Sequence, residues 1–566
     1  MTLPEPDPNS RYNSRDIIAL VVIILLLGIQ FLWACHLNKQ LYTVHGPFYD
    51  SMDYYGQVAD NYHHIFEGDW PVALHNVLHR VNGMLEQLAL LPLAWVFGYS
   101  RSAGIFIQSV GIFFLSVSLY HYFRTVHEKD RFFSFMLSLP FLSLGSIYNF
   151  NGGLSDFRVD LLLYLGIACS ACWYLIARHR PERRFNWVAL GICASATVLS
   201  RGTAPIYLAL MIGPILCVDL LFSSRDRERF RSIVIGALIT ALICVVLTVW
   251  YFILNFDRLY YYYFIWNADA NASLPLSVSS RHITFSFWHV DRPLLFGFVI
   301  TGLISGVSIL LRKEKSWRKL ILLEGPAVWL WAAPLLFLVL RGAGLNPFVS
   351  MPAALGIVMG SMILVAYSGC GGISRILIVL AIGISCLASA ATGVKKHYQP
   401  DINNASAYAK IRSLVEENAA PEGEITVGFY TCGWATGRAY RSYLLFDSGY
   451  FLSSGGLKKN GRIVNILEIA PAVLVDWEKL PGNDDEERIR SITSRLLDNA
   501  DYILVPEPKT IEHLKTNLPF NYINLYTDRI TDELLKSQQL EAISGEAPLV
   551  FNPQEKFRLY RNMGIR

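Results

Sequence analysis

The sequence predicts an all-α polytopic membrane domain followed by an extracytoplasmic α/β soluble domain. Hydrophobic residues make up 53% of the 566 residues and charged residues only 17%, and the mean hydropathy is +0.35. Such a composition is typical of an integral membrane protein. Apolar runs approaching the ~20 residues that cross a bilayer recur up to residue 395. Beyond that point, charged helical stretches alternate with short apolar strands.

About eleven spans are expected from the apolar runs between charged breaks. Basic connectors at residues 124–131, 178–184, 225–231 and 312–319 are expected on the cytoplasmic side by the positive-inside rule. The N-terminus is then cytoplasmic, and the first apolar run has no small-residue cleavage site, so we expect an uncleaved first span. The spans lie near residues 17–36, 103–123, 133–148, 159–177, 187–200, 204–222, 232–255, 293–311, 320–340, 347–367 and 374–394.

The apolar run at residues 84–98 is ambiguous because it is only about 15 residues long and contains Glu86, Gln87 and Pro92. Counting it as a span would place the N-terminus and connector 124–131 on opposite sides of the membrane. We therefore expect a membrane-surface or re-entrant helix within a large first external loop, residues 37–102. A short true span is the alternative.

Residues 396–566 are expected to form a soluble α/β domain outside the membrane, after a membrane domain at residues 1–395. The alternation of helical and strand patterns predicts it. No glycine-rich phosphate loop, catalytic triad or zinc pattern occurs there, so acceptor binding or structural support is the expected role. Expected helices are 406–418, 484–499 and 528–538, and expected strands are 425–430, 472–476, 502–506 and 522–526.

The first external loop carries two carboxylates, Asp50 and Asp53, flanked by Tyr54, Tyr55 and other aromatic residues. One helical turn separates the two acids, so they share a face if the segment is helical. The aromatic neighbours would bury much of the surroundings. That favours a perturbed, functional carboxylate over a solvated acidic loop.

The second external loop carries Asp156, Arg158 and Asp160 at the start of a span. An acid at the top of a membrane helix is costly unless it is paired or used. Either Arg158 pairs locally with an acid, or Asp156 or Asp160 faces the same cavity as Asp50.

Arg201 stands alone between two apolar spans on the external side. Such a cation either snorkels to the surface or binds an anion, and the planar guanidinium matches two phosphate oxygens. The loop 256–292 adds Tyr263, Trp266 and His282. Aromatic rings there could form an interfacial belt or stack on a sugar.

This arrangement resembles the GT-C glycosyltransferases, especially the dolichyl-phosphate-mannose protein mannosyltransferase branch that includes bacterial lipid A aminoarabinose transferase. The likeness covers roughly residues 10 to 395. It departs at Ser51, where the family often has Glu, and at Arg201, where Lys is common. The matching motifs are Asp50-Ser-Met-Asp-Tyr54, Glu67-Gly-Asp-Trp70, Trp95-Val-Phe-Gly98, Asp160, Arg201-Gly202 and the turn at 346–352.

The resemblance implies a polyprenyl-phosphate-linked sugar donor and a lipid, glycan or protein acceptor on the external face. Asp50 would be the general base of an inverting transfer. Arg201, with Arg158 or His45, would stabilise the departing phosphate. Asp53, Asp156 and Asp160 are the other catalytic candidates, and the candidates for substrate contact are Tyr54, Tyr55, Tyr263, Trp266 and His282.

No cofactor is required by these residues, although Asp50, Asp53 and Asp156 are oxygen ligands of the kind that Mg or Mn prefers. A multi-pass protein of the cell inner membrane is expected, in contact with membrane lipids, with the C-terminal domain periplasmic and no nucleic-acid partner. One alternative is a transporter or flippase of a lipid-linked substrate, but no inverted repeat is visible. Another is a glycan polymerase or ligase.

Overall fold

The computed structural model divides into two compact units. The first comprises Met1–His36, Leu74–Leu90 and Ser102–His397, and the second Leu37–Ala73, Leu91–Arg101 and Tyr398–Arg566. Most of the first external loop thus groups with the C-terminal region. The structure describes residues 14–44, 49–149, 152–266, 276–310, 317–341, 350–368, 372–395, 404–469, 480–517, 522–545 and 547–565.

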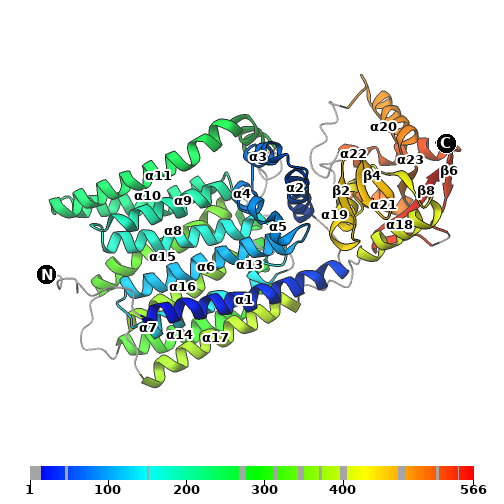
Figure 1. Ribbon diagram of the computed structural model, residues 1–566. Helices are drawn as coiled ribbons and strands as arrows, with labels where there is room; N and C mark the ends of the chain where they lie inside the picture. The colour runs from blue at the N-terminus through cyan, green and yellow to red at the C-terminus, as the bar shows by residue number, and fades with distance from the viewer. Residues whose placement is uncertain are drawn as a thin grey trace. The chain divides into compact units, whose positions relative to one another are not determined.

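The first unit is a bundle of long helices that lie side by side (Figure 1). Its long helices are α1 (Ser14–Val44), α6 (Ser102–Thr125), α8 (Val159–His179), α9 (Arg184–Ser200), α10 (Ala204–Ser223), α11 (Arg227–Tyr260), α13 (Leu276–Val290), α14 (Pro293–Leu310), α15 (Trp317–Arg341), α16 (Met351–Ser368) and α17 (Gly372–Lys395). Shorter pieces are α3 (Trp70–Leu78), α4 (Met84–Leu90), α7 (Arg131–Ser138), the 3-10 turns η2 (Leu139–Ser143) and η3 (Gly145–Ile147), and the π-helical η4 (Tyr261–Trp266).

Six of the described helices are long and apolar enough to cross a membrane: α1, α6, α8, α10, α11 and α17. The pair α13 and α14, bent by 88° between them, would make a seventh. The remaining predicted spans fall on α7 with η2, α9, α15 and α16, whose described residues are too short to meet the same test. Each of the eleven predicted spans therefore coincides with helix in the described part of the chain.

Helix α8 is the centre of the first unit. Its spanning window is 89% buried, and it contacts α6, α9, α10, α15 and α16. A helix that is apolar on all sides is buried on all sides. Close approach to α9 depends on Gly166, where an added Cβ would lie 2.5 Å from Thr197 Oγ1. The packing of α8 against α9 therefore brings the first turn of α8 close to the last turn of α9.

The ambiguous run at 84–98 is broken into α4, the 3-10 turn η1 (Leu91–Leu93) and α5 (Ala94–Phe97). Pro92 lies in the break, where it has no backbone N–H to give to a continuous helix. Even as one helix, Met84–Phe97 would span only about 21 Å at 1.5 Å per residue. That is shorter than the ~30 Å of hydrocarbon, and the non-crossing interpretation stays our prediction.

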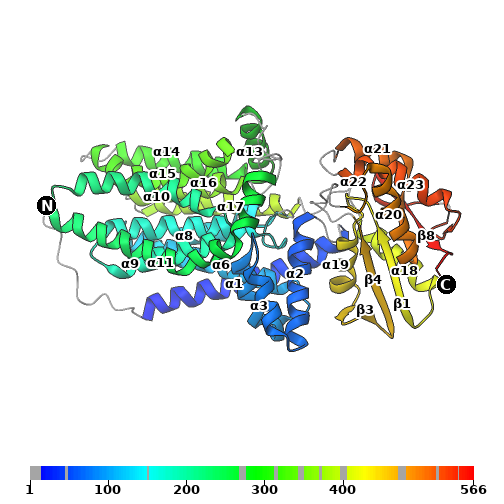
Figure 2. The same ribbon diagram turned by 90° about the horizontal axis from the view of Figure 1, so that it is seen from above.

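The second unit combines α2 (Tyr49–Phe66) with an α/β domain (Figure 2). The sequence predicts the α/β domain but not its grouping with α2. The sheet order is β2-β3-β4-β1-β5-β8-β6, with β7 paired to β8. Strands β4, β1 and β5 are parallel and the other pairs antiparallel. The strands are β1 (Gly423–Phe429), β2 (Phe451–Ser453), β3 (Gly456–Lys459), β4 (Arg462–Glu468), β5 (Tyr502–Pro506), β6 (Leu540–Ala542), β7 (Leu549–Asn552) and β8 (Glu555–Asn562).

Helices cover both faces of this sheet. Strand β5 shows why: Tyr502 and Leu504 belong to the core under α18 and α19, whereas Ile503 and Val505 belong to the core under α20 and α23. Alternate strand residues point to opposite faces. The helices are α18 (Ala405–Asn418), α19 (Gly437–Asp447), α20 (Asp485–Asn499), α21 (Pro508–Asn517), α22 (Tyr522–Leu525) and α23 (Thr527–Lys536).

The element predictions for this domain are mostly confirmed, with one error. The expected helices match α18, α20 and α23, and two expected strands match β1 and β5. The expected strand at 522–526 is wrong, because this segment forms α22. A short apolar run does not distinguish a buried helical turn from a strand. The expected strand at 472–476 lies outside the described residues.

Candidate functional site

Arg201 is positioned by the junction of α9 and α10. The main chain of Arg201 forms an isolated antiparallel bridge with that of Asn82, and Gly83 N donates to the Ser200 carbonyl at 2.9 Å. These main-chain contacts hold the start of α4 against the end of α9. Arg201 therefore lies beside the segment that leads into α4.

Arg201 forms an ion pair with Asp160. Asp160 lies in the first turn of α8, with 5% of its surface exposed. The expectation that Arg201 stands alone is wrong, because the packing of α8 against α9 brings the two residues together across 41 positions of sequence. A buried acid at a helix end is here paired, as the cost of an isolated charge requires.

Arg158 pairs with Asp156 instead, with Nε 3.2 Å from Oδ2. Asp156 Oδ2 also accepts a hydrogen bond from Gly152 N at 2.8 Å, and Gln108 Nε2 donates to the Arg158 carbonyl at 2.9 Å. Both charged side chains are buried. The local ion pair foreseen for this loop thus exists, with Asp156 as its acid.

Glu86 is the functional candidate that sequence reasoning missed. It lies in the first turn of α4 with 1% of its surface exposed. Burial raises the pKa of Glu86 to about 8, against the opposing effects of Arg80, the Ser200 hydroxyl and Arg201. In the sequence, Glu86 is an acid inside an apolar stretch, as Asp160 is. Such an acid argues against a membrane span and also indicates a functional site.

The end of α11 and η4 lie against the segment that leads into α4. Four of their side chains bond to that segment, and Tyr263 reaches Asn82, beside Arg201. An added Cβ at Gly202 would lie 2.7 Å from Tyr263 Cε2, so this glycine admits the ring. The bonds run from Tyr251 Oη to the Val81 carbonyl, from Asn255 Nδ2 to the Leu78 carbonyl, from Arg258 to the His79 carbonyl and from Tyr263 Oη to Asn82 Oδ1.

Two ion pairs reach α19 within the second unit, one from Asp60 on α2 and one from Arg101, the residue directly before α6. Arg101 donates to both oxygens of Asp447, with Nη2 3.0 Å from Oδ2, and Arg441 pairs with Asp60. The Arg101 guanidinium lies 3.6 Å from the centre of the Tyr42 ring. We call these two ion pairs the α2 clamp.

Tyr55 belongs to the same packing. Its ring is 1% exposed, lies 5.7 Å from Phe446 between ring centres, and its hydroxyl donates to the Arg101 carbonyl at 3.4 Å. Tyr54, its neighbour on α2, is partly buried. Tyr55 thus anchors the helix that begins with the two loop acids.

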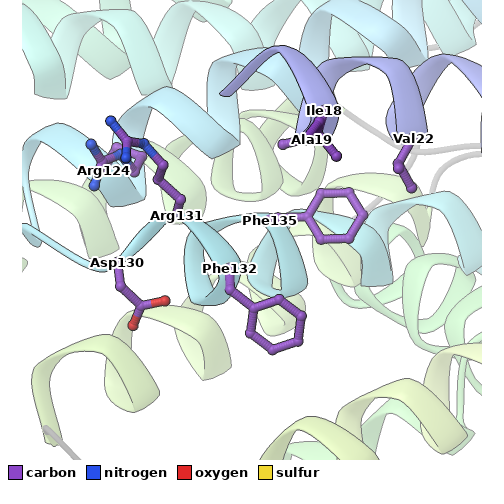
Figure 3. A pocket seen from close by; sticks show the side chains of 8 residues that line it. All are labelled: Ile18, Ala19, Val22, Arg124, Asp130, Arg131, Phe132 and Phe135. Atoms are coloured by element: carbon purple, nitrogen blue, oxygen red, sulfur yellow. The ribbon is translucent and has the colours of Figure 1, made fainter. Parts of the chain in front are cut away.

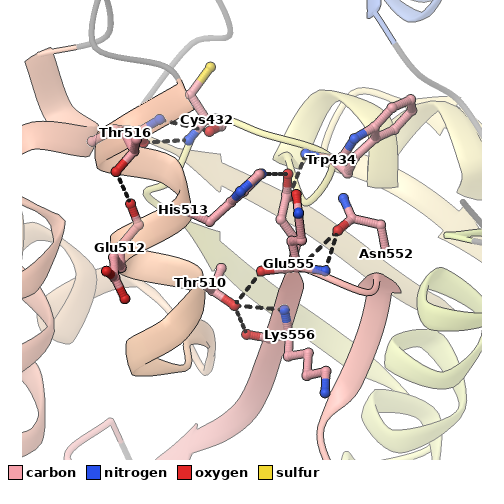
Figure 4. A network of polar contacts seen from close by, with 11 residues as sticks. Cys432, Trp434, Thr510, Glu512, His513, Thr516, Asn552, Glu555 and Lys556 are labelled. Atoms are coloured by element: carbon pink, nitrogen blue, oxygen red, sulfur yellow. Dashed lines mark hydrogen bonds and ion pairs between the residues drawn. The ribbon is translucent and has the colours of Figure 1, made fainter. Parts of the chain in front are cut away.

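A second polar network lies in the C-terminal domain (Figure 4). Glu555 is buried, which raises its pKa to about 7. It accepts a hydrogen bond from Trp434 N at 2.9 Å and lies 3.9 Å from His513 Nε2. Asn552 Oδ1 accepts from Glu555 N at 2.8 Å. The network joins the loop after β1 to β8 and α21, which favours structural support.

No protein-family model and no curated protein matches the sequence. Among solved structures, the chain is similar to ArnT from Cupriavidus metallidurans bound to undecaprenyl phosphate, with a TM-score of 0.53 and 10% identity over 95% of this chain and 97% of that one. ArnT in the apo state gives 0.50 and 11% over the same shares. The archaeal oligosaccharyltransferase AglB from Archaeoglobus fulgidus gives 0.44 and 12%, over 95% and 74%.

The chain has a GT-C fold. Its helical bundle and C-terminal α/β domain together match ArnT over nearly the full length of both chains. The expected fold class is therefore confirmed, and the chain is a multi-pass membrane protein. At 10% identity the likeness concerns the fold, so the chemistry must be argued from the site.

Several candidate residues fall at the limits of the described structure. Asp50 and Asp53 lie in the first turns of α2, but their side chains are outside the described part, as is the whole of His45. Trp266 ends η4, with its side chain likewise outside, and His282 lies partly buried on α13. Among the described residues, no group of three or more His, Cys, Asp or Glu is arranged to hold a metal.

Proposed function

We propose that this protein is a membrane glycosyltransferase that moves a sugar from a polyprenyl-phosphate donor to an acceptor hydroxyl on the periplasmic face of the inner membrane. The observation that carries the proposal is the cluster of two buried acids, Glu86 and Asp160, with the partly buried Arg201. Intramembrane charges of this kind mark functional sites by default. Support comes from the fold, since ArnT, which shares it, was solved with undecaprenyl phosphate bound.

Asp50 is our proposed general base. It would take the proton of the acceptor hydroxyl while the hydroxyl oxygen attacks the anomeric carbon of the donor sugar. The bond between that carbon and the phosphate oxygen breaks, the configuration inverts, and polyprenyl phosphate leaves with the bonding electrons. Asp53, three residues along α2, would support this acid or share a cation with it.

Arg201 is our proposed contact for the leaving phosphate. The pair with Asp160 orients the guanidinium, whose planar N–H donors match two oxygens of a phosphate. Arg158 and His45 are weaker candidates, because Arg158 is engaged by Asp156.

Glu86 would not repel the phosphate at neutral pH. With a pKa of about 8 it is mostly protonated there, and a neutral carboxyl can donate a hydrogen bond. We assign it to the donor's phosphate or sugar hydroxyls. Tyr263, on the other side of Gly202, is then the best placed of the aromatic candidates for the sugar.

A divalent metal such as Mg or Mn stays a prediction that depends on Asp50 and Asp53. Asp156 is a poorer ligand than the sequence suggests, because Arg158 and Gly152 N already occupy its oxygen Oδ2. Activity after dialysis against a chelator, with and without added Mg or Mn, tests this.

Asp50→Asn is the experiment that tests the proposal. Mass spectrometry of cells lacking the protein would first identify the lipid-linked sugar that accumulates. We expect Asp50→Asn to lower transfer of that sugar by about 100-fold or more, while the purified variant still binds undecaprenyl phosphate. Asp257→Asn, an exposed acid on α11, is the matched control and should transfer normally. Normal transfer by Asp50→Asn would remove the base assignment, and no accumulation of any lipid-linked sugar would remove the proposed donor class.

A further inference from the structure

A pocket of about 630 Å³ lies where α1, α6 and α7 meet, away from the cluster around Arg201 (Figure 3). Its volume falls in the range of small-molecule sites. The lining residues are Ile18, Ala19, Val22, Arg124, Asp130, Arg131, Phe132 and Phe135.

The pocket has one charged end and one apolar end. In Figure 3, Arg124 and Arg131 lie at one end, and Val22 and Phe135 at the other. Ile18 and Val22 are four residues apart on α1 and so lie on one face of that helix. The site is therefore shaped for an amphiphile, with a polar group at one end and a hydrocarbon chain at the other.

The charged end carries an excess of positive charge. Arg131 Nε lies 2.8 Å from Asp16 Oδ1, and Asp130 pairs with Arg375 at 2.7 Å. Arg124 donates to the Lys129 carbonyl at 3.0 Å. Asp16 and Asp130 are thus each paired with another arginine. Among the described residues, no carboxylate forms an ion pair with Arg124. An anion completes this end better than a cation or a neutral group.

Apolar side chains of the pocket are exposed on the surface of the bundle. Ile18 and Phe132 line the pocket and are 60% and 72% exposed, and α1 and α6 are both long enough to cross a membrane. The basic connector 124–131 is expected on the cytoplasmic side. Basic pockets between membrane helices on that side suit anionic lipid head groups.

We propose that this pocket binds one anionic phospholipid of the cytoplasmic leaflet. Its phosphate lies between Arg124 and Arg131, and an acyl chain follows Ile18, Val22 and Phe135. A choline or ethanolamine head group would find its natural partner, Asp130, already paired with Arg375. The site is separate from the proposed transfer reaction, which we place on the periplasmic face.

Lipid binding by the full-length protein tests the proposal. The protein is placed in vesicles of phosphatidylcholine with a small fraction of spin-labelled phosphatidylglycerol, and the motionally restricted fraction is measured. We expect Arg124→Gln to lower the affinity for phosphatidylglycerol about fivefold, the effect of one basic residue at the surface. Arg124→Lys should retain most of it. Arg225→Gln removes an exposed arginine from another basic connector and should bind like the wild type.

Several outcomes would overturn the proposal. Arg124→Gln that binds phosphatidylglycerol as the wild type does, while remaining folded by thermal melting, would exclude Arg124 as the phosphate contact. Equal binding of spin-labelled phosphatidylcholine would exclude anionic selectivity. Displacement of the lipid by millimolar inorganic phosphate would indicate a site for free phosphate. If Arg124→Gln does not fold, unchanged binding of phosphatidylglycerol by a Phe135→Ala variant, which shortens the apolar wall, would overturn the proposal.

Discussion

The two ends of helix α8 carry buried ion pairs of different kinds. At its last turn, Arg178 Nε lies 2.8 Å from Asp219 Oδ2, and Tyr174 Oη donates to the same oxygen at 3.1 Å. At its first turn, Asp160 pairs with Arg201. Both pairs join α8 to a neighbouring part of the bundle, so each contributes to the fold.

The difference lies in what surrounds each pair. Asp219 receives both of its donors, Arg178 and Tyr174, from consecutive turns of α8. Around Asp160 and Arg201 there is a further buried acid, Glu86, whose pKa is raised, and a loop bonded to α9 and α11. An ion pair whose carboxylate has donors from the neighbouring helix serves packing. A cluster with more ionisable groups than one ion pair needs indicates a site for a ligand.

The largest expected effect separates the two pairs by activity. Arg201→Gln should lower sugar transfer by about 100-fold or more, since it removes the proposed stabilisation of the leaving phosphate. The accumulated lipid-linked sugar, measured by mass spectrometry in cells that carry the variant, reports the loss. Arg178→Gln is the matched change at the other end. Equal losses of transfer in the two variants, at equal protein levels, would contradict the division into a site and a packing pair.

The second effect separates them by stability. Asp219→Asn should lower the free energy of unfolding by about 3 to 5 kcal/mol, because it leaves the Arg178 charge buried without its partner. The double variant Arg178→Met with Asp219→Leu should recover most of that loss. Thermal melting in detergent measures both. A double variant as unstable as the single one would mean that the pair is more than a packing contact.

The smallest effect concerns the pH dependence of the site. Because the pKa of Glu86 is raised to about 8 in the folded protein, the folded state binds a proton that the unfolded state has lost above its ordinary pKa. The stability of the wild type should therefore fall, relative to Glu86→Gln, as the pH rises from about 5 to about 8, and then level off. Melting temperatures of the two proteins across this range measure it. A constant difference would mean that Glu86 is ionised throughout.

Much of the fold could be predicted because each step depends on local pattern. Apolar length predicts the helices, and these coincide with helices of the structure. The orientation that the connector charges predict stays a prediction. The strand β5 and the helix α20 follow from period and capping, as Asp484 Oδ1 accepts from Glu487 N at 2.8 Å. The segment 522–526 failed because four or five apolar residues carry no period.

The site was less predictable, because its contacts join distant segments. The partner of Arg201 depends on how α8 packs on α9, and the sequence near Arg201 does not indicate that this partner is Asp160. Glu86 was visible as a misplaced charge, but its burial depends on α4 meeting the end of α9. The roles of Asp50 and Asp53 remain predictions from the sequence.

The α2 clamp has a consequence for how the protein is made. Arg101 and Asp447 are 346 positions apart, and Asp60 and Arg441 are 381 apart. At a synthesis rate of about 5 to 20 residues per second, the ribosome needs about 20 to 70 s to pass from Arg101 to Asp447. During that time α2 has emerged without the helix that fixes it. A newly made chain thus cannot complete the start of its first loop until its last domain has been translated and folded.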